Sequence, residues 1–294
     1  ASVGLMSSGQ SYETPFAQVV GEAIGVDAKH VRLQTGHTDI APYGMGSRGA
    51  RGGTAGGSVL WLCAMDARAK LLAIARKLLG GTDRELRIRD GLVQSREDTG
   101  WTATTLTLAQ IARTAYLDPL ALPAGMAPGL EFVKTYDPPP MTYSNATHAC
   151  VVAVDRDTGH IAIERYVIAE DCGVVMNPQI VAGQQHGATS MGLGGALLEH
   201  VIYDRNGQNL TGTLADYLLP TATDLPNYEL LAMHTPSRAT PIGLKGMAEG
   251  GVMGAIGAVC LAVQDALAPF GTIVDRQPLT PERVLGWING GRRG

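Results

Sequence analysis

The sequence predicts an α+β fold, and three observations support this prediction. Two pairs of apolar segments, at residues 86–94 and 149–169, are each separated by a short polar turn, a spacing typical of β-hairpins. Longer stretches with helical periodicity and clear end signals lie between these hairpins. The order of the elements therefore does not fit a parallel sheet in which every strand is followed by a helix.

The first half of the chain predicts short strands, three helices and one hairpin. Its helices have recognisable ends, because Pro15 is suited to a first turn and Gly25 to a C-terminal stop. The expected elements are, in order, a strand at 1–5, a helix from Pro15 to Ile24, a strand at 31–35, a glycine-rich loop at 42–57, a helix at 58–79, a hairpin at 86–94 with an Asp-Gly turn, and a helix at 106–116.

A proline-rich stretch predicts a division of the chain. Residues 117–141 contain six prolines, which favour an extended connection over a helix or a central strand. We expect a first α+β subdomain with glycine-rich cofactor loops at residues 1–125, a Pro-rich crossing at 126–145, and a second α+β subdomain at 146–294. The second subdomain is expected to contain the hairpin at 149–169, a glycine-rich helix at 178–199 and a buried helix at 252–267.

Composition excludes several classes of function. The chain has 294 residues, with 23 Lys and Arg against 27 Asp and Glu, so its net charge of −4 does not indicate nucleic-acid binding. The sequence shows neither a signal peptide nor a membrane-spanning stretch, and we expect no membrane association and a cytoplasmic location. The four cysteines stand singly with no Cys-x-x-Cys, which does not favour an iron–sulfur or zinc site.

The strongest catalytic candidate is Glu249. It stands alone ahead of two glycines and an apolar helix that Pro269 and Gly271 end. A carboxylate at such a position is expected to have its pKa raised by burial, or its charge held by the helix N-terminus, and either would suit a general base. The same pattern also fits a solvated or N-capping glutamate.

Glycine-rich segments around Gln10, residues 47–57 and Gln184 predict a cofactor site. Main-chain N–H groups of such segments bind phosphates and other anions, and the glutamines add amide donors and acceptors. Together they indicate one large anionic cofactor held mostly by main chain. Gly44–Gly49 also fits the dinucleotide pattern G-x-G-x-x-G, but a loop separates it from the preceding strand and Asp66 falls inside a helix, so we do not favour this interpretation.

In their order, these segments resemble the C-terminal half of the molybdenum-binding subunit in the xanthine dehydrogenase/aldehyde oxidase family of molybdenum hydroxylases. The resemblance covers nearly the whole chain, and Ser11, Tyr12 and Ala248 depart from the family pattern. The matching segments are Gly9–Thr14 for G-Q-G-H-x-T, Gly46–Arg48 for G-S-R, Asp171–Gly187 for D-x-G-x-x-x-N-P-x-x-x-x-G-Q-x-x-G, Asp216–Pro220 for D-Y-x-x-P, and Lys245–Glu249 for K-G-x-G-E.

The resemblance implies a molybdopterin cofactor, in the cytosine dinucleotide form, that carries the molybdenum. Glu249 would be the general base beside the metal, in a hydroxylation of an N-heteroaromatic compound or oxidation of an aldehyde that takes its oxygen from water. No residue would ligate molybdenum directly, because the pterin holds it, with Gln184 and Glu249 near it. The residues implied to bind the cofactor are Gly9, Gln10, Ser47, Arg51, Gly52, Gly53, Thr54 and Gln184.

The resemblance also implies partners. The family's other molybdenum-subunit half, its [2Fe-2S] domain and its FAD domain are not in this sequence. We therefore expect a separately encoded or cleaved subunit that joins an N-terminal-half molybdopterin subunit, an iron–sulfur subunit and a flavin subunit in a dimer of hetero-oligomers. Expressed alone, the chain should bind little cofactor.

Three alternatives remain at the level of sequence. The chain could be a non-catalytic scaffold of such a complex, which a Glu249→Gln variant would distinguish. It could be a nicotinamide dehydrogenase that uses the Gly44–Gly49 loop, which metal analysis would distinguish. Carbon monoxide dehydrogenase-like activity also stays open, because residues outside this sequence help to line the pocket.

Overall fold

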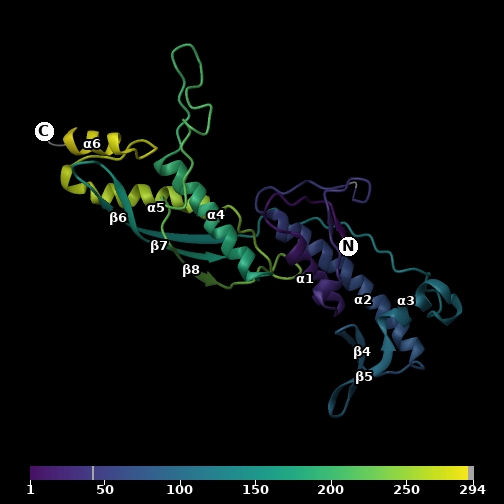
Figure 1. Ribbon diagram of the computed structural model, residues 1–294. Helices are drawn as coiled ribbons and strands as arrows, with labels where there is room; N and C mark the ends of the chain where they lie inside the picture. The colour runs from purple at the N-terminus through teal and green to yellow at the C-terminus, as the bar shows by residue number, and fades with distance from the viewer. Residues whose placement is uncertain (42, 291–294) are drawn as a thin grey trace. The chain divides into compact units, whose positions relative to one another are not determined.

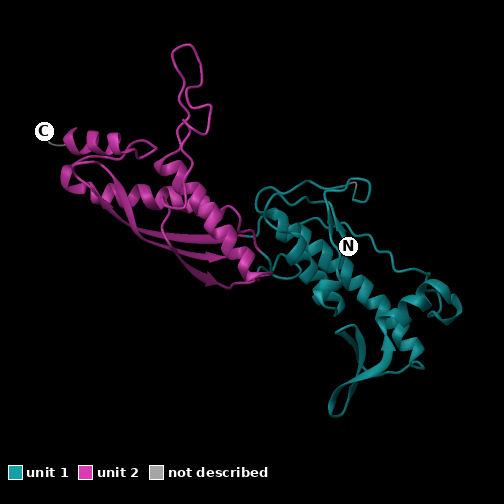
Figure 2. Cartoon of the chain, viewed as in Figure 1, with its two compact units in different colours: residues 1–142, 237–244 teal, residues 143–236, 245–294 magenta. Residues whose placement is uncertain are grey.

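A computed structural model describes residues 1–41 and 43–290, which form two compact units (Figures 1 and 2). Unit 1 consists of Ala1–Thr142 and Ser237–Leu244, and unit 2 of Tyr143–Pro236 and Lys245–Gly294. The chain therefore leaves unit 2 after Pro236, contributes eight residues to unit 1, and returns at Lys245. Our sequence-based division assigned this short excursion to the second subdomain, because no change in composition marks it.

Unit 1 mixes helices with two small sheets, as an α+β fold requires (Figure 2). Strands β1 and β2 pair in parallel, and β3, β4 and β5 form an antiparallel sheet in that order. The elements are β1 Ser2–Val3, α1 Glu13–Ile24, a 3₁₀ turn Ala28–His30, β2 Gln34–Thr35, a π-helical turn Gly52–Gly57, α2 Ser58–Leu78, β3 Leu86–Arg89, β4 Leu92–Glu97, β5 Gly100–Thr107, α3 Leu108–Leu117 and a 3₁₀ turn Pro119–Ala121.

Local sequence signals explain most element ends in unit 1. Gly25 ends α1 in the left-handed conformation, with φ of 95°. Asp90 and Gly91 both have positive φ, as the tight turn between β3 and β4 requires. Thr107 and Gln110 form a capping box at the start of α3. The Gly25 helix end and the Asp-Gly turn were predicted and are confirmed, whereas the capping box was not predicted.

The glycine run before α2 differs from our prediction. We expected a loop up to residue 57, but Gly52–Gly57 forms a π-helical turn that continues into α2. A Cβ atom at Gly52 would collide with the Tyr12 hydroxyl, and one at Gly56 would lie 2.5 Å from a Leu5 methyl group. The small residues therefore let this turn pack closely on the start of the chain and on α1.

Unit 2 is a three-stranded sheet covered on one face by helices (Figure 1). β7 is the central strand, with β6 antiparallel on one side and β8 parallel on the other. The elements are β6 Asn145–Val154, β7 Ile161–Asp171, α4 Pro178–Leu197, β8 Tyr228–Met233, α5 Gly250–Ala266, a 3₁₀ turn Ala268–Phe270 and α6 Pro281–Gly290. The predicted hairpin and the two glycine-rich helices are confirmed, whereas β5, β8 and α6 were not predicted.

The core of unit 2 lies between the sheet and the three helices. Tyr166 and Ile168 face inward from β7 and are fully buried. Side chains from all three helices complete this cluster, including Leu193 and Ala196 of α4, Ala255, Val259 and Val263 of α5, and Val284 and Ile288 of α6.

Our prediction of a buried helix near residue 252 is only partly right. α5 buries Ala255, Val259 and Val263, but Met253 and Leu261 on its other face are each 71% exposed. One stripe of the helix packs against α4 and the sheet, and the opposite stripe, with Met253 and Leu261, is largely exposed. None of the helices among residues 1–41 and 43–290 is long and apolar enough to cross a bilayer.

Candidate functional site

Glu249 lies at the start of α5 in unit 2. It takes the N-cap position, with its carbonyl accepting a 3.3 Å hydrogen bond from the Met253 amide, but its side chain does not cap the helix. The side chain is exposed. Of the alternatives that the sequence left open, the exposed glutamate is the one seen here, because Glu249 precedes the residues of α5 that enter the core.

Gln184 and Glu249 lie at the same end of the α4–α5 pair. These helices run side by side in the same direction, because a Cβ atom at Gly251 would meet Ala188 and one at Gly192 would meet Ala255. Gln184 lies one turn before Ala188, and Glu249 just precedes α5. The helix pair therefore places the two predicted residues near one another.

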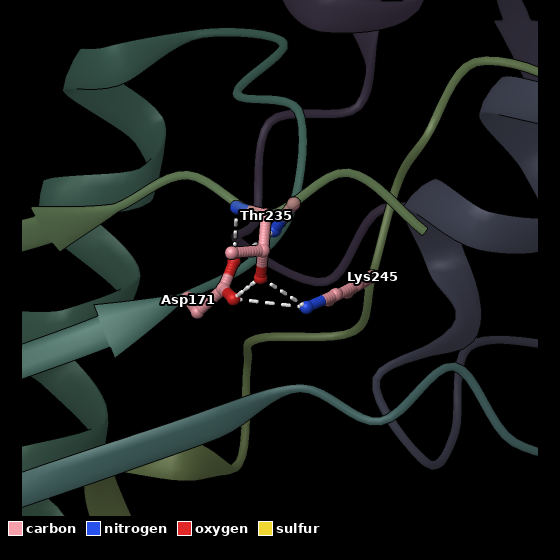
Figure 3. A network of polar contacts seen from close by, with 4 residues as sticks. Asp171, Thr235 and Lys245 are labelled. Carbon is pink, nitrogen blue, oxygen red and sulfur yellow. Dashed lines mark hydrogen bonds and ion pairs between the residues drawn. The ribbon is translucent and has the colours of Figure 1, made fainter. Parts of the chain in front are cut away.

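Asp171 is the centre of a buried polar network beside this end of the helices (Figure 3). Its carboxylate is 1% exposed and accepts hydrogen bonds from the Lys245 ammonium at 2.9 Å and from the amide and hydroxyl groups of Thr235. It also accepts a 2.9 Å bond from the Gly173 amide, a contact that stabilises the turn after β7. Burial alone raises the pKa of Asp171, but the bonds from Thr235 and Lys245 outweigh it and hold this pKa well below its usual range.

Glu170, the preceding residue, has a contrasting environment on the other face of β7. It is 3% exposed, and neither carboxylate oxygen has a hydrogen-bond partner of normal geometry among the described residues. Burial raises the pKa of Glu170 to about 7, and the nearby Gln185 side chain opposes the rise only in part. A Cβ atom at Gly250 would lie 2.5 Å from Glu170 Oε1, so this acid packs directly against the first residue of α5.

Two further polar side chains, the buried Thr189 and the half-buried His148, face the start of α5. A Cβ at Gly251 would lie 3.0 Å from the Thr189 hydroxyl, and one at Gly254 would collide with the His148 ring. The Thr189 hydroxyl and His148 Nε2 have no hydrogen-bond partner of normal geometry in the described chain, whereas His148 Nδ1 lies 3.0 Å from the Tyr166 hydroxyl. Burial lowers the pKa of His148. The glycines of α5 thus make room for a polar layer beneath Glu249.

In unit 1, two segments that hold predicted cofactor residues contact one another. The Ser47 hydroxyl donates to the Met6 carbonyl at 3.3 Å, which brings the glycine-rich loop to the turn that holds Gly9 and Gln10. Tyr12, which follows this turn, packs against Gly52 and stacks on Phe16. These contacts bring the segment that contains Ser47, Arg51, Gly52, Gly53 and Thr54 to the segment that contains Gly9 and Gln10, whereas Gln184 belongs to unit 2.

These unit 1 residues fit a phosphate-bearing polar cofactor in their chemistry. Gly9, Gly46 and Gly49 have positive φ with open space where a Cβ would be, so a ligand can approach their main chain. Gln10 Oε1 accepts a 2.6 Å bond from the Ser8 amide, which orients the amide group. Ser11, at the position where the family pattern has glycine, takes the left-handed conformation that glycine favours, with φ of 54°.

Thr54 and Gly52 are the least accessible of the predicted cofactor residues. Thr54 is 4% exposed and its hydroxyl donates to the Arg51 carbonyl at 3.2 Å, while Gly52 is buried against Tyr12. Their main structural role is to shape the π-helical turn. The Gly44–Gly49 loop is exposed, and Asp66 forms an ion pair with Lys134 on the side of α2, an arrangement that does not resemble a dinucleotide site.

Sequence reasoning did not identify Glu170, His148 and Thr189 as members of a site. Asp171 and Lys245 appeared there only as motif letters without a role. The signal for Glu170 was present, since a carboxylate on the inward-facing side of a strand is unusual, but strand alternation cannot show whether it has a partner. The described residues contain no group of three or more His, Cys, Asp or Glu side chains that could hold a metal ion.

Comparison with known proteins places this geometry in a family. A family described as "Molybdopterin cofactor-binding domain" matches residues 1–226. The nicotine 6-hydroxylase large subunit of Paenarthrobacter nicotinovorans is 36% identical over 96% of this chain and 34% of its own length. The carbon monoxide dehydrogenase large chain of Hydrogenophaga pseudoflava is 37% identical over 97% of this chain and 35% of its own length.

Solved structures agree with the sequence comparison. Quinoline 2-oxidoreductase from Pseudomonas putida 86 superposes with a TM-score of 0.89 at 36% identity, over 98% of this chain and 36% of that one. The chain thus spans about a third of the length of the relatives that it matches. It belongs to the molybdopterin cofactor-binding domain family and corresponds to the C-terminal part of a molybdenum hydroxylase large subunit.

Proposed function

We propose that this chain is the C-terminal, molybdopterin-binding part of the catalytic subunit of a multi-subunit molybdenum hydroxylase. The observation that carries the proposal is the position of Glu249 at the start of α5, beside Gln184 and above the buried polar layer. When bound, the cofactor would supply the redox chemistry and the activation of water-derived oxygen. Glu249 would accept the proton as general base.

The cofactor would be held largely by unit 1. The open main chain at Gly9, the amide of Gln10 and the guanidinium group of Arg51 offer donors that suit phosphate oxygens. Gln184 would supply a further amide donor near the molybdenum. We propose the cytosine dinucleotide form, with [2Fe-2S] and FAD on partner chains and an N-terminal-half molybdopterin subunit completing the site in a hetero-oligomer.

An N-heteroaromatic compound is the substrate class that we favour. Two similar proteins are named for nicotine and quinoline, both of which are N-heteroaromatic. Carbon monoxide oxidation is a second candidate, because a carbon monoxide dehydrogenase large chain has comparable identity. Turnover of quinoline, nicotine, an aromatic aldehyde and carbon monoxide by one assembled complex would distinguish these candidates.

Substitution of Glu249 tests the proposal. In the assembled, molybdenum-loaded complex, Glu249→Gln should lower kcat by about 10²–10⁴-fold, the usual contribution of a positioned general base. Molybdenum content should stay unchanged, because Glu249 does not hold the metal. The control is Glu164→Gln on an exposed position of β7, which should keep full activity. An active Glu249→Gln complex would instead favour a scaffold role.

A further inference from the structure

We propose that Glu170 and Asp171, the last two residues of β7, are positioning residues for Glu249 and hold its segment from both sides. This inference rests on the function proposed above, since the position of Glu249 matters to the reaction only if that residue takes part. The starting observation is that Glu249 is exposed and its side chain does not cap α5. Its position must therefore come from the residues that flank it.

On the N-terminal side, Asp171 anchors Lys245, four residues before Glu249. The Lys245 ammonium lies 2.9 Å from Asp171 Oδ2 and 2.8 Å from the Thr235 hydroxyl, and its side chain is only 10% exposed. The Lys245 amide also donates to the Cys172 carbonyl at 2.9 Å. Both the main chain and the side chain of Lys245 are thus bound to the end of β7.

The same network joins the two ends of the excursion into unit 1. Thr235 lies just before the chain leaves unit 2, and Lys245 is the first residue after its return. Because Asp171 binds both residues, it closes this loop at its base (Figure 3). Movement of the excursion would otherwise pass directly along the chain to Glu249.

On the C-terminal side, Glu170 packs against Gly250, the residue that follows Glu249. The carboxylate fills the space that a side chain at Gly250 would need. The next residue, Gly251, fits equally closely against the Thr189 amide, with a Cβ-to-nitrogen distance of 2.8 Å. The first turn of α5 is therefore seated on β7 and α4 within two residues of Glu249.

The strand that supplies both anchors is rigid for a physical reason. β7 is paired on both sides, with Glu170 opposite Ala146 and Ala232, and Asp171 opposite Asn145 and Met233. Alternation along the strand directs the two neighbouring carboxylates to opposite faces. The end of β7 can therefore hold the chain on both sides of Glu249, at Lys245 through Asp171 and at Gly250 through Glu170.

The environment of Glu170 makes its role depend on pH. Cys172, which follows β7, is a titratable group close to it, and His148 of β6 lies against Gly254 of α5. Helix α4 contributes the uncharged Gln185, and α5 contributes the main chain of Gly250. Ionisation of Glu170 would place a buried, poorly solvated charge under the first turn of α5. The neutral form is the one that packs without this cost.

The test uses the assembled, molybdenum-loaded complex and two independent readouts. Asp171→Asn should increase amide hydrogen exchange of residues 246–254 by about tenfold or more and lower kcat by up to about 100-fold with little change in KM. Thr235→Val keeps the ion pair but loses the hydroxyl contacts to Asp171 and Lys245, and it should produce the same changes at a smaller magnitude. It keeps the test informative if Asp171→Asn does not assemble.

The effect of Glu170→Gln on hydrogen exchange and on kcat should depend on pH. Residues 246–254 of the parent complex should exchange faster at about pH 8 than at about pH 6 after correction for intrinsic rates, and the variant should lose this difference. The pH profile of kcat should change in the same range. The matched control is Asp155→Asn, which removes a capping carboxylate from the exposed turn at the other end of the β6–β7 hairpin and should change neither readout.

The outcomes separate this inference from the proposed function. If Glu249→Gln is inactive while Asp171→Asn, Thr235→Val and Glu170→Gln leave exchange, kcat and the pH profile at parent values, the positioning inference is wrong and the proposed function stands. If Glu249→Gln is fully active, the proposed function fails, and the exchange measurements still decide whether β7 holds this segment.

Discussion

Glu170 and Asp171 are neighbours on one strand, and both are almost fully buried, yet their environments are opposite. Asp171 accepts hydrogen bonds from Gly173, Thr235 and Lys245, and its pKa is held well below the usual range. Glu170 has no hydrogen-bond partner of normal geometry within the described chain, and burial raises its pKa to about 7.

The difference shows that burial alone does not determine the state of a carboxylate. Both side chains lose their water, which favours the neutral form. Asp171 meets an ammonium group, a hydroxyl group and main-chain donors that more than compensate, whereas Glu170 meets the uncharged Gln185 side chain and the main chain of Gly250. Two adjacent acids thereby give the site one permanent charge and one that titrates near neutrality.

The largest expected effect comes from removal of a partner from the buried ion pair. Asp171→Asn or Lys245→Met should each lower the free energy of unfolding by about 3–5 kcal/mol, because each leaves a buried charge without compensation. Denaturant unfolding of the purified protein measures this change. The double variant should recover part of the loss, as a coupled pair requires.

An exposed ion pair on the same strand is the control for this prediction. Arg165 binds Glu229 through two bonds of 2.7 and 2.8 Å, but both side chains are more than half exposed. Arg165→Met should therefore leave the unfolding midpoint almost unchanged. Equal destabilisation by Arg165→Met and Lys245→Met would contradict our account of the buried network.

The second prediction concerns pH and Glu170. The folded protein keeps a proton on Glu170 up to about pH 7, whereas the unfolded chain releases it near the ordinary value of 4.5. The folded state therefore binds more protons in this window, and its stability falls as pH rises through it. Glu170→Gln should not show this loss. Above pH 7, the free energy of unfolding of the variant should exceed that of the parent by up to about 3 kcal/mol.

Urea unfolding of parent and variant across this range measures the effect. The advantage of Glu170→Gln should shrink toward zero as the pH approaches the ordinary glutamate value. A constant difference at every pH would mean that Glu170 does not titrate in the folded protein, and the contrast with Asp171 would lose its electrostatic basis.

The third prediction compares two glycines of α5. A Cβ at Gly251 would lie 2.7 Å from the Ala188 Cβ and 2.8 Å from the Thr189 amide, and main chain cannot move aside easily. Gly251→Ala should therefore cost about 1–3 kcal/mol. Gly257 has open space at the same atom, so Gly257→Ala should stabilise the helix by up to about 1 kcal/mol.

Thermal unfolding of the two variants side by side provides the measurement. Opposite changes in the unfolding temperature of Gly251→Ala and Gly257→Ala would show that one face of α5 is closely packed and that the other is exposed. Destabilisation by both would show that the open stripe with Met253 and Leu261 is covered by something else in the purified protein.

Local signals predicted much of the fold but not all of it. The Asp90-Gly91 turn, the Gly25 helix end and the hairpin formed by β6 and β7 depend on nearby residues, so pattern and turn chemistry were sufficient. β8 was missed because Tyr-Glu-Leu-Leu-Ala-Met lacks clear alternation and pairs with β7 across more than fifty intervening residues. The π-helical turn at Gly52–Gly57 depends on packing against Tyr12 and Phe16, which its own sequence does not show.

The sequence by itself determined which family this chain resembles and which residues are candidates for the site, because ordered motifs are properties of the chain alone. The burial of Glu170, the exposure of Glu249 and the joining of Thr235 to Lys245 through Asp171 were decided only by the tertiary structure. The physical reason is that solvation and hydrogen-bond partners come from residues distant in the chain, and folding alone brings them together.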